Sequence, residues 1–130
     1  MLVVYVAGPF RAKNSWDMEQ NIRRAEELAL EVWRAGFACV SPHLNTRCFQ
    51  GVLPDQVWLD GDFAILKKCD VLLMTPDWKR SAGATEEREY ARQQGMPVYY
   101  ALQDLVNAAA LDAAQDLIDV AAWQEPLLDS

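Results

Sequence analysis

Short apolar runs alternate along this chain with longer stretches in which apolar residues recur every three or four positions. The short runs cover residues 2–7, 37–40, 70–75 and 98–101 and have the character of buried strands. Helical periodicity occupies the stretches between them. This alternation predicts repeated βα units. Right-handed crossovers then indicate a small doubly wound, flavodoxin- or Rossmann-like α/β sheet of four or five parallel strands with helices on both faces.

Several residues indicate where the helices begin and end. Asp17, with Gln20 three positions later, resembles a capping pair at the start of the first helix. Gly95 is expected to end the helix before the fourth strand. Residues 41–54 predict an irregular segment that is too long for an ordinary connection, and such loops often cover a site. Residues 102–130 are rich in Ala and Asp and predict one or two helices.

Composition limits the possible functions. The length of 130 residues predicts one domain, residues 1–130, whose helical C-terminal region 102–130 is available for a subunit contact. The 12 basic and 19 acidic residues give a net charge of -7, which argues against binding a nucleic-acid polymer. Three widely spaced cysteines indicate neither disulfides nor a zinc site. We expect a cytoplasmic protein without a membrane segment, a signal peptide or a metal.

Ligands of doubly wound sheets bind at the carboxyl ends of the strands. The loops that follow the first three predicted strands therefore hold the candidate binding residues. After the first strand, a tight turn precedes an arginine whose planar donors can contact an anion. The only histidine follows the second strand, and an aspartate follows the third. These loop residues are Gly8, Pro9, Phe10, Arg11, His43 and Asp77.

Three glutamates crowd the start of the helix that follows the third strand, in SAGATEEREYA at residues 81–91. Ser81 and Gly83 precede them at a helix N-terminus that suits a phosphate or a carboxylate. Glu87 shares one helical stripe with two alanines small enough to press on the sheet. Glu86 and Glu89 point elsewhere. We therefore expect Glu87 to face the strand ends, where a carboxylate seldom serves stability alone.

The preceding helix carries a second acidic candidate. Asp62 lies seven residues after Asp55, so that one helix face can present both carboxylates to the site. A solvated face is the competing interpretation. Nearby tryptophans such as Trp58 could stack on a base, or pack in the core or at an oligomer contact.

Three segments together resemble the nucleoside 2′-deoxyribosyltransferase superfamily. They are YVAGP at residues 5–9, DFAILKKCDVLLM at residues 62–74 and SAGATEEREYA, and the likeness covers roughly the first hundred residues. The resemblance implies Glu87, in G-x-x-x-E with Gly83, as the nucleophile. It also implies Asp62 as the acid that protonates the leaving base, with Tyr5 orienting the glutamate. Helix N-terminal donors are expected to keep Glu87 ionised.

Within that superfamily, this sequence is most similar to the nucleoside 5′-monophosphate N-glycosidases. Ser81 stands where transferases acting on free nucleosides carry an Asp, and Ser can donate a hydrogen bond to a phosphate that Asp would repel. Arg11 coincides with an arginine of the hydrolases. Glu89 departs from the family, which has a small residue there. The resemblance implies cleavage of a nucleotide without a cofactor, by a homodimer or higher homo-oligomer.

Two other functions stay open at this point. One is base exchange on free deoxynucleosides, as in a nucleoside 2′-deoxyribosyltransferase. The other is a non-catalytic nucleotide-binding or sensor module that keeps the cleft without the chemistry. A receiver-type domain is disfavoured, because no acidic pair follows the first strand.

Overall fold

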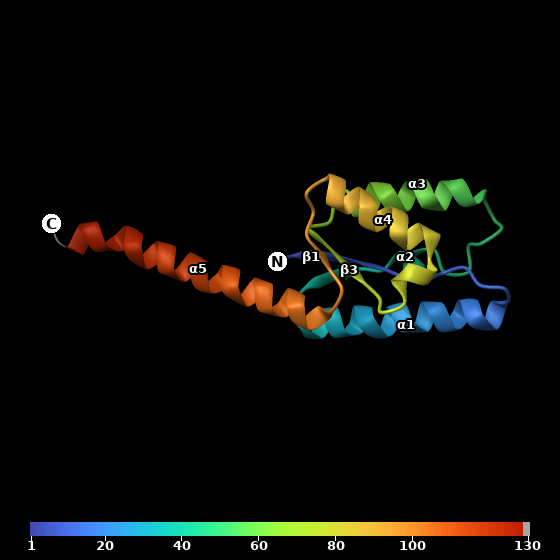
Figure 1. Ribbon diagram of the computed structural model, residues 1–130, viewed down its shortest axis with the longest axis horizontal. Coiled ribbons are helices and arrows are strands. Elements are labelled where there is room, and N and C mark those ends of the chain that lie inside the picture. The colour runs from blue at the N-terminus through green and yellow to red at the C-terminus, as the bar shows by residue number, and fades with distance from the viewer. Residues whose placement is uncertain (129–130) are drawn as a thin grey trace.

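The computed structural model describes the backbone of residues 1–128 and the side-chain surroundings of residues 1–122. Four parallel strands form one sheet in the order β2-β1-β3-β4, which confirms the predicted α/β fold (Figure 1). The elements are β1 (Val3–Ala7), α1 (Ser15–Arg34), β2 (Ala38–Val40), α2 (Pro42–Asn45), α3 (Asp55–Leu66), β3 (Val71–Met74), the 3₁₀ helix η1 (Trp78–Arg80), α4 (Ala82–Gln93), β4 (Val98–Tyr99) and α5 (Leu102–Leu128).

Two helical layers cover the sheet because alternate side chains of each strand point to opposite faces. Tyr5 and Ala7 of β1 pack on one face with residues of α3 and α4. Val4 and Val6 pack on the other face with residues of α1 and the first turns of α5. Figure 1 shows α3 and α4 on one side of the strands and α1 on the other. The strand order reverses at β1, so the chain leaves β1 and β3 toward different neighbours.

The first helix begins earlier than the sequence predicted. Asn14 is its N-cap, and the side chain of Asn14 accepts a hydrogen bond from the backbone N–H of Asp17 at 2.8 Å. Asp17 therefore lies in the first turn, where its charge favours the helix dipole. The expected capping pair of Asp17 and Gln20 was wrong, because the helix already includes Ser15.

At the C-terminal end of α4, Gly95 adopts a φ of 71°, as expected for the residue that follows a helix.

The segment between β2 and α3 is partly regular. It contains α2, a single turn of helix that begins directly after Ser41, where an irregular loop was predicted. Cys48 and Gly51 then take φ values of 66° and 84°, which turn the chain back toward α3. The prediction missed α2 because four residues are too few to show a helical period.

Gly8 directly follows β1 and lies against Thr75, which directly follows β3. The backbone N–H of Thr75 donates to the carbonyl of Ala7 at 2.8 Å, which extends the pairing of the two strands by one residue. A Cβ atom on Gly8 would lie 2.2 Å from Oγ1 of Thr75. Only glycine therefore allows the first loop to leave the sheet along this path.

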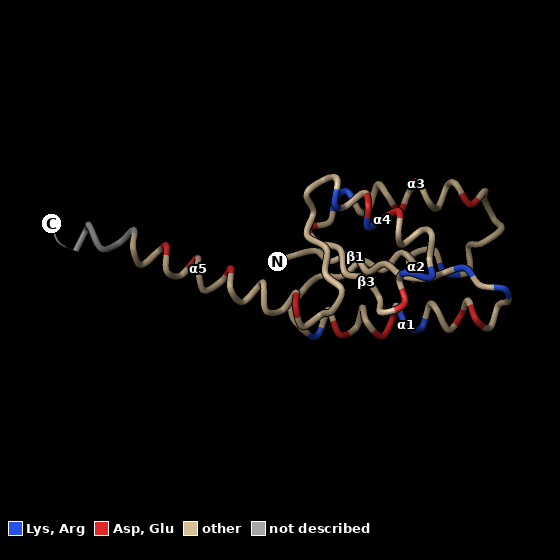
Figure 2. The backbone as a smooth tube through the Cα atoms, viewed as in Figure 1, with Lys and Arg blue, Asp and Glu red and all other residues tan. Residues whose placement is uncertain are grey.

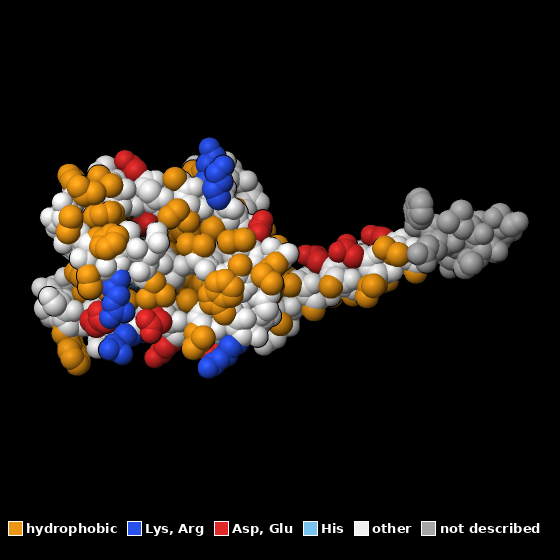
Figure 3. Space-filling model, turned by 180° about the vertical axis from the view of Figure 1, so that it is seen from behind, with side chains coloured by type: hydrophobic (Ala, Val, Ile, Leu, Met, Phe, Trp, Pro, Cys, Tyr) orange, Lys and Arg blue, Asp and Glu red, His pale blue; other side chains and the backbone are white. Residues whose placement is uncertain are grey.

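The C-terminal region is one 27-residue helix, α5, that extends away from the domain (Figure 1). Its first turns pack against the core, but every residue from 110 to 122 is exposed. The exposed part carries Leu111, Leu117 and Ile118 together with acidic residues and no basic ones (Figures 2 and 3). Residues 129–130 of the predicted region lie outside the described residues. No helix among the described residues combines the length and apolar character needed to span a bilayer.

The subunit contact expected of the C-terminal region can be tested on α5. Light scattering on the full chain should give a mass above that of one 14.7 kDa chain. Replacing both Leu117 and Ile118 with Asp should reduce it to one chain, because charges would enter the buried contact. Asp116→Asn, on the polar side of the helix, should leave the mass unchanged. A wild-type protein that stays monomeric at high concentration would contradict the expectation.

The close approach at Gly8 predicts a large effect on stability. We expect Gly8→Ala to lower the free energy of unfolding by ~1–3 kcal/mol or more, since the added methyl overlaps Thr75. Gly61→Ala is the matched control. It lies inside α3 with no atom within 4 Å of the new Cβ, and it should be neutral or stabilise by up to ~1 kcal/mol. Urea unfolding of both variants measures the difference, and equal effects would refute the steric argument.

Candidate active site

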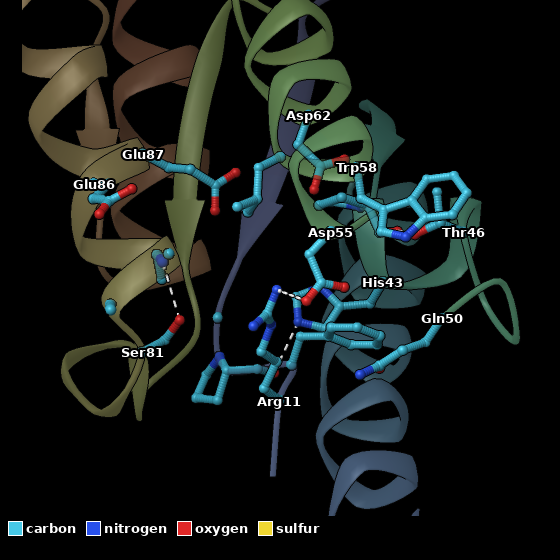
Figure 4. Close-up of a pocket in the computed structure, with 18 of the residues that line it drawn as sticks. Arg11, His43, Thr46, Gln50, Asp55, Trp58, Asp62, Ser81, Glu86 and Glu87 are labelled. Carbon is cyan, nitrogen blue, oxygen red and sulfur yellow. Dashed lines mark hydrogen bonds and ion pairs between the residues drawn. The ribbon is translucent and has the colours of Figure 1, made fainter. Parts of the chain in front are cut away.

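A pocket of about 380 Å³ opens where β1 and β3 end (Figure 4). Its walls come from the loop after β1, from α2 and α3, and from the N-terminal end of α4. All of the site residues expected from the sequence line it except Tyr5 and Asp77. The predicted residues in the lining are Gly8, Pro9, Phe10, Arg11, His43, Asp62, Ser81, Gly83 and Glu87.

The three glutamates of α4 occupy different surroundings, as the helical spacing predicts. Ala84 and Ala91 are 1% and 0% exposed, and Glu87 lies on the same side of the helix between them. Glu86 and Glu89 are exposed. Figure 4 shows Glu87 extending from α4 toward Asp62 on α3, whereas Glu86 lies on the far side of Glu87 from Asp62. Glu87 is thus the carboxylate that α4 presents to the interior of the pocket.

Burial controls the protonation of Glu87. Loss of hydration raises the pKa of Glu87 from 4.5 to about 7, and the negative charges of Asp62 and Glu86 add to the rise. The expectation that helix N-terminal donors keep this carboxylate fully ionised was wrong. Desolvation outweighs the helix dipole here, because Glu87 is in the second turn of α4, where the dipole is already weak.

Tyr5 lies behind Glu87 in the core, with a side chain that is 0% exposed. Burial, and then the Glu87 carboxylate, raise the pKa of Tyr5, so its hydroxyl keeps its proton. The hydroxyl is close enough to favour the ionised form of Glu87 and so opposes the rise in the pKa of that carboxyl. Neither the Tyr5 hydroxyl nor Oε2 of Glu87 has a partner in full hydrogen-bond geometry among the described residues. Tyr5 is therefore a neutral donor held beside Glu87.

One face of α3 supplies the opposite wall of the pocket. Asp55, Trp58, Leu59 and Asp62 all line it, at the spacing i, i+3, i+4 and i+7. Burial raises the pKa of Asp62 to about 6. The pocket therefore contains two carboxyl groups, Asp62 and Glu87, whose pKa values both lie above the ordinary range for a carboxyl group.

The N-terminus of α4 offers hydrogen-bond donors to an anion. Ser81 is the N-cap, and its Oγ accepts from the N–H of Ala84 at 3.0 Å, which leaves the hydroxyl proton free to donate. Helix geometry leaves the N–H groups of Ala82 and Gly83 without partners inside the helix. Arg11 enters the pocket from the loop after β1, where its Nη2 lies 2.8 Å from Oδ2 of Asp55. This end of the pocket can bind a phosphate or a carboxylate.

His43 lies beneath the loop after β1. Its Nε2 is 2.8 Å from the carbonyl oxygen of Pro9, and a carbonyl only accepts, so Nε2 carries the proton. Burial lowers the pKa of His43, which keeps the ring neutral. The ring also meets Phe10 edge to face at 5.5 Å. His43 thus holds the loop that carries Arg11.

Asp77 is not brought into the pocket. It accepts a hydrogen bond from Oγ1 of Thr75 at 2.8 Å and pairs with Arg24 and Arg80 at 3.8 Å and 3.6 Å. These contacts hold the turn between β3 and α4. The sequence could not reveal this, because Arg24 lies on α1, more than fifty residues earlier in the chain.

Four further polar residues line the pocket without having been selected from the sequence: Thr46, Gln50, Arg80 and Glu86. Arg80 directly precedes Ser81 in the loop after β3, so its place at a strand end was a usable signal. The other three carried no pattern that separates them from surface residues. Among the described residues, no cluster of three or more His, Cys, Asp or Glu side chains is arranged to hold a metal ion.

The fold matches that of a solved enzyme. The chain superimposes on a 2-deoxyribosyltransferase from Bacillus psychrosaccharolyticus with a TM-score of 0.54 and 19% sequence identity, covering 74% of this chain and 69% of that one. This match confirms, at the level of the fold, the resemblance to the nucleoside 2′-deoxyribosyltransferase superfamily. No curated protein matches the sequence significantly.

Residues 2–100 match the model of a protein family described as a domain of unknown function, DUF4406. Because the match covers most of the chain, the protein belongs to this family. The matched range includes every residue of the pocket and stops just before α5.

The raised pKa of Glu87 predicts how stability depends on pH. The folded chain binds this proton more tightly than the unfolded chain, so its stabilising effect is complete below about pH 4.5 and is lost as the pH rises to about 7. Above that, the buried carboxylate costs on the order of 3 kcal/mol. Glu87→Gln should therefore raise the free energy of unfolding near pH 8 and change it little near pH 4. Glu89→Gln, on the exposed side of α4, is the control, and an equal gain in both variants would contradict the burial argument.

Proposed function

We propose that this protein cleaves the N-glycosidic bond of a nucleoside 5′-monophosphate and releases a free base and a sugar 5-phosphate. One observation carries the proposal: Glu87 and Asp62 face the same pocket from two helices, and donors suited to a phosphate end that pocket. Paired carboxyl groups are the usual catalysts of glycosidic cleavage.

In the proposed reaction, Glu87 and Asp62 have different roles. The Glu87 carboxylate attacks the anomeric carbon of the sugar, and the electrons of the C–N bond leave with the base, which takes a proton from Asp62. Water then attacks the same carbon, Asp62 accepts a proton from the water, and the bond to Glu87 breaks. Sugar phosphate leaves, and both carboxyl groups return to their first state.

This division of roles requires one particular protonation state of the pocket. Attack requires an ionised Glu87, and protonation of the base requires a neutral Asp62. Burial raises both pKa values, to about 7 for Glu87 and about 6 for Asp62, so in the ligand-free pocket the proton lies more on Glu87 than on Asp62. Their negative charges repel, which favours the state with one shared proton. The reaction therefore requires the proton to pass from Glu87 to Asp62, and the neutral Tyr5 hydroxyl favours that state because it lowers the pKa of Glu87.

The phosphate would bind at the N-terminus of α4. The hydroxyl of Ser81 and the first amides of the helix can donate to it, and Arg11 can supply charge. Gly83 has only Oγ of Ser81 within 4 Å of a built Cβ, at 3.8 Å, so the fold itself would accept a larger residue there. A glycine that packing does not require is consistent with a ligand that approaches the backbone.

Base exchange on free deoxynucleosides is the second candidate, favoured by the solved neighbour, which is named as a 2-deoxyribosyltransferase. In that reaction an acceptor base, rather than water, would take the sugar from Glu87. A non-catalytic nucleotide-binding module is the third. These three functions differ in the product that is released and in whether an acceptor base is required.

Incubation of the purified protein with ribo- and deoxyribonucleosides and their 5′-monophosphates tests all three. Free base should appear from at least one 5′-monophosphate without an acceptor base, and chromatography would detect it. Glu87→Ala should reduce release by roughly a thousandfold or more, since it removes the nucleophile. Glu89→Ala, on the same helix but exposed and outside the pocket lining, should keep most of the activity.

The other outcomes identify the alternatives. A new nucleoside formed only when a free base is added would indicate base exchange. Thermal stabilisation by nucleotides without any release of base would indicate a binding module. Release that is unchanged in Glu87→Ala would refute the proposed nucleophile.

A further inference from the structure

The mouth of the pocket is bridged by an ion pair between two of its walls. Arg11 comes from the loop after β1, and Asp55 is the first residue of α3. The guanidinium and carboxylate groups are 2.8 Å apart, and both residues line the pocket (Figure 4). Arg11 is therefore not a free cation in this state, because Asp55 already neutralises it.

The ion pair between Arg11 and Asp55 is weak enough for an anionic ligand to replace Asp55. The side chains are 58% and 47% exposed, and pairs so exposed contribute only ~0–1 kcal/mol. The separated partners would also be well accommodated. Asp55 lies in the first turn of α3, where the free N–H groups and the helix dipole favour a negative charge. Arg11 would remain in water or meet another anion.

The position of Asp55 along α3 determines which part of a bound ligand lies near it. Asp62 lies two helical turns deeper, ~10 Å further along the axis. If Asp62 serves the glycosidic bond, Asp55 lies toward the other end of a bound nucleotide, where it contacts Arg11. Figure 4 shows Arg11 between Ser81 and Asp55 in this view.

We propose that Asp55 is a specificity-determining residue that competes with the ligand for Arg11. This inference rests on the proposed function for the identity of the ligand. A phosphate monoester carries a charge of about -1.5 to -2 at neutral pH, which exceeds that of one carboxylate, so it takes Arg11 from Asp55. A nucleoside without phosphate leaves the pair closed. Asp55 thereby lowers the affinity for every anion and reserves Arg11 for a strongly charged one.

Binding measurements test the proposal without requiring turnover. Calorimetry with inorganic phosphate, adenosine 5′-monophosphate and adenosine would compare the wild type with Asp55→Asn. We expect Asp55→Asn to bind both phosphate ligands about 2- to 5-fold more tightly, because the competitor for Arg11 is removed. Its affinity for adenosine should not change.

Two variants make this result specific. Asp60→Asn removes the same charge from the same helix, but Asp60 is exposed, accepts from Gln56 and does not line the pocket, so it should give a smaller gain. In an Arg11→Gln background, Asp55→Asn should give no gain beyond that of Asp60→Asn.

The proposal is overturned by any of four results. These are weaker or unchanged phosphate binding in Asp55→Asn, a gain equal to that of Asp60→Asn, a gain that survives in Arg11→Gln, and no phosphate binding in any variant. Failure to release a base, with the expected binding pattern intact, would reject the glycosidase and leave the assignment of Asp55 standing.

Discussion

The junction between the ends of β1 and β3 is the constraint on which the site depends. The strand order reverses there. The hydrogen bond from the N–H of Thr75 to the carbonyl of Ala7 fixes the point at which the loops after β1 and β3 leave the sheet. Gly8 lets the first loop cross directly over Thr75. The loop that carries Arg11 and the turn that starts α4 at Ser81 are therefore set by the same contact. A shift of one residue in this register would separate the two walls of the pocket.

The second constraint is the burial of Glu87. Burial of this carboxylate destabilises the folded protein when Glu87 is ionised, and the neutral hydroxyl of Tyr5 partly offsets this cost. A glutamine at this position would pack equally well and would carry no such cost above neutral pH. Stability alone therefore does not explain an ionisable group at this position. The chemistry of the carboxylate is the better explanation.

The sequence allowed the fold and most of the predicted pocket residues to be placed, because helical periodicity and the positions of strand ends are local signals. Glu87 could be separated from Glu86 and Glu89 since two buried alanines define its helical face. Thr46 and Gln50, which lie between α2 and α3, gave no such signal. The ion pair of Asp77 with Arg24 was also out of reach, because only folding brings these two residues together. The raised pKa of Glu87 was also inaccessible, because it results from a competition between burial and local dipoles.

The charge balance of the pocket connects these features. Two arginines and four carboxyl groups line it: Arg11, Arg80, Asp55, Asp62, Glu86 and Glu87. With all four carboxyl groups ionised, the pocket would repel a phosphate. The raised pKa values of Asp62 and Glu87 reduce this negative charge near neutral pH, so their burial also favours the entry of an anion. Each arginine pairs with a carboxylate other than Asp62 and Glu87, since Arg11 contacts Asp55 and Arg80 contacts Asp77.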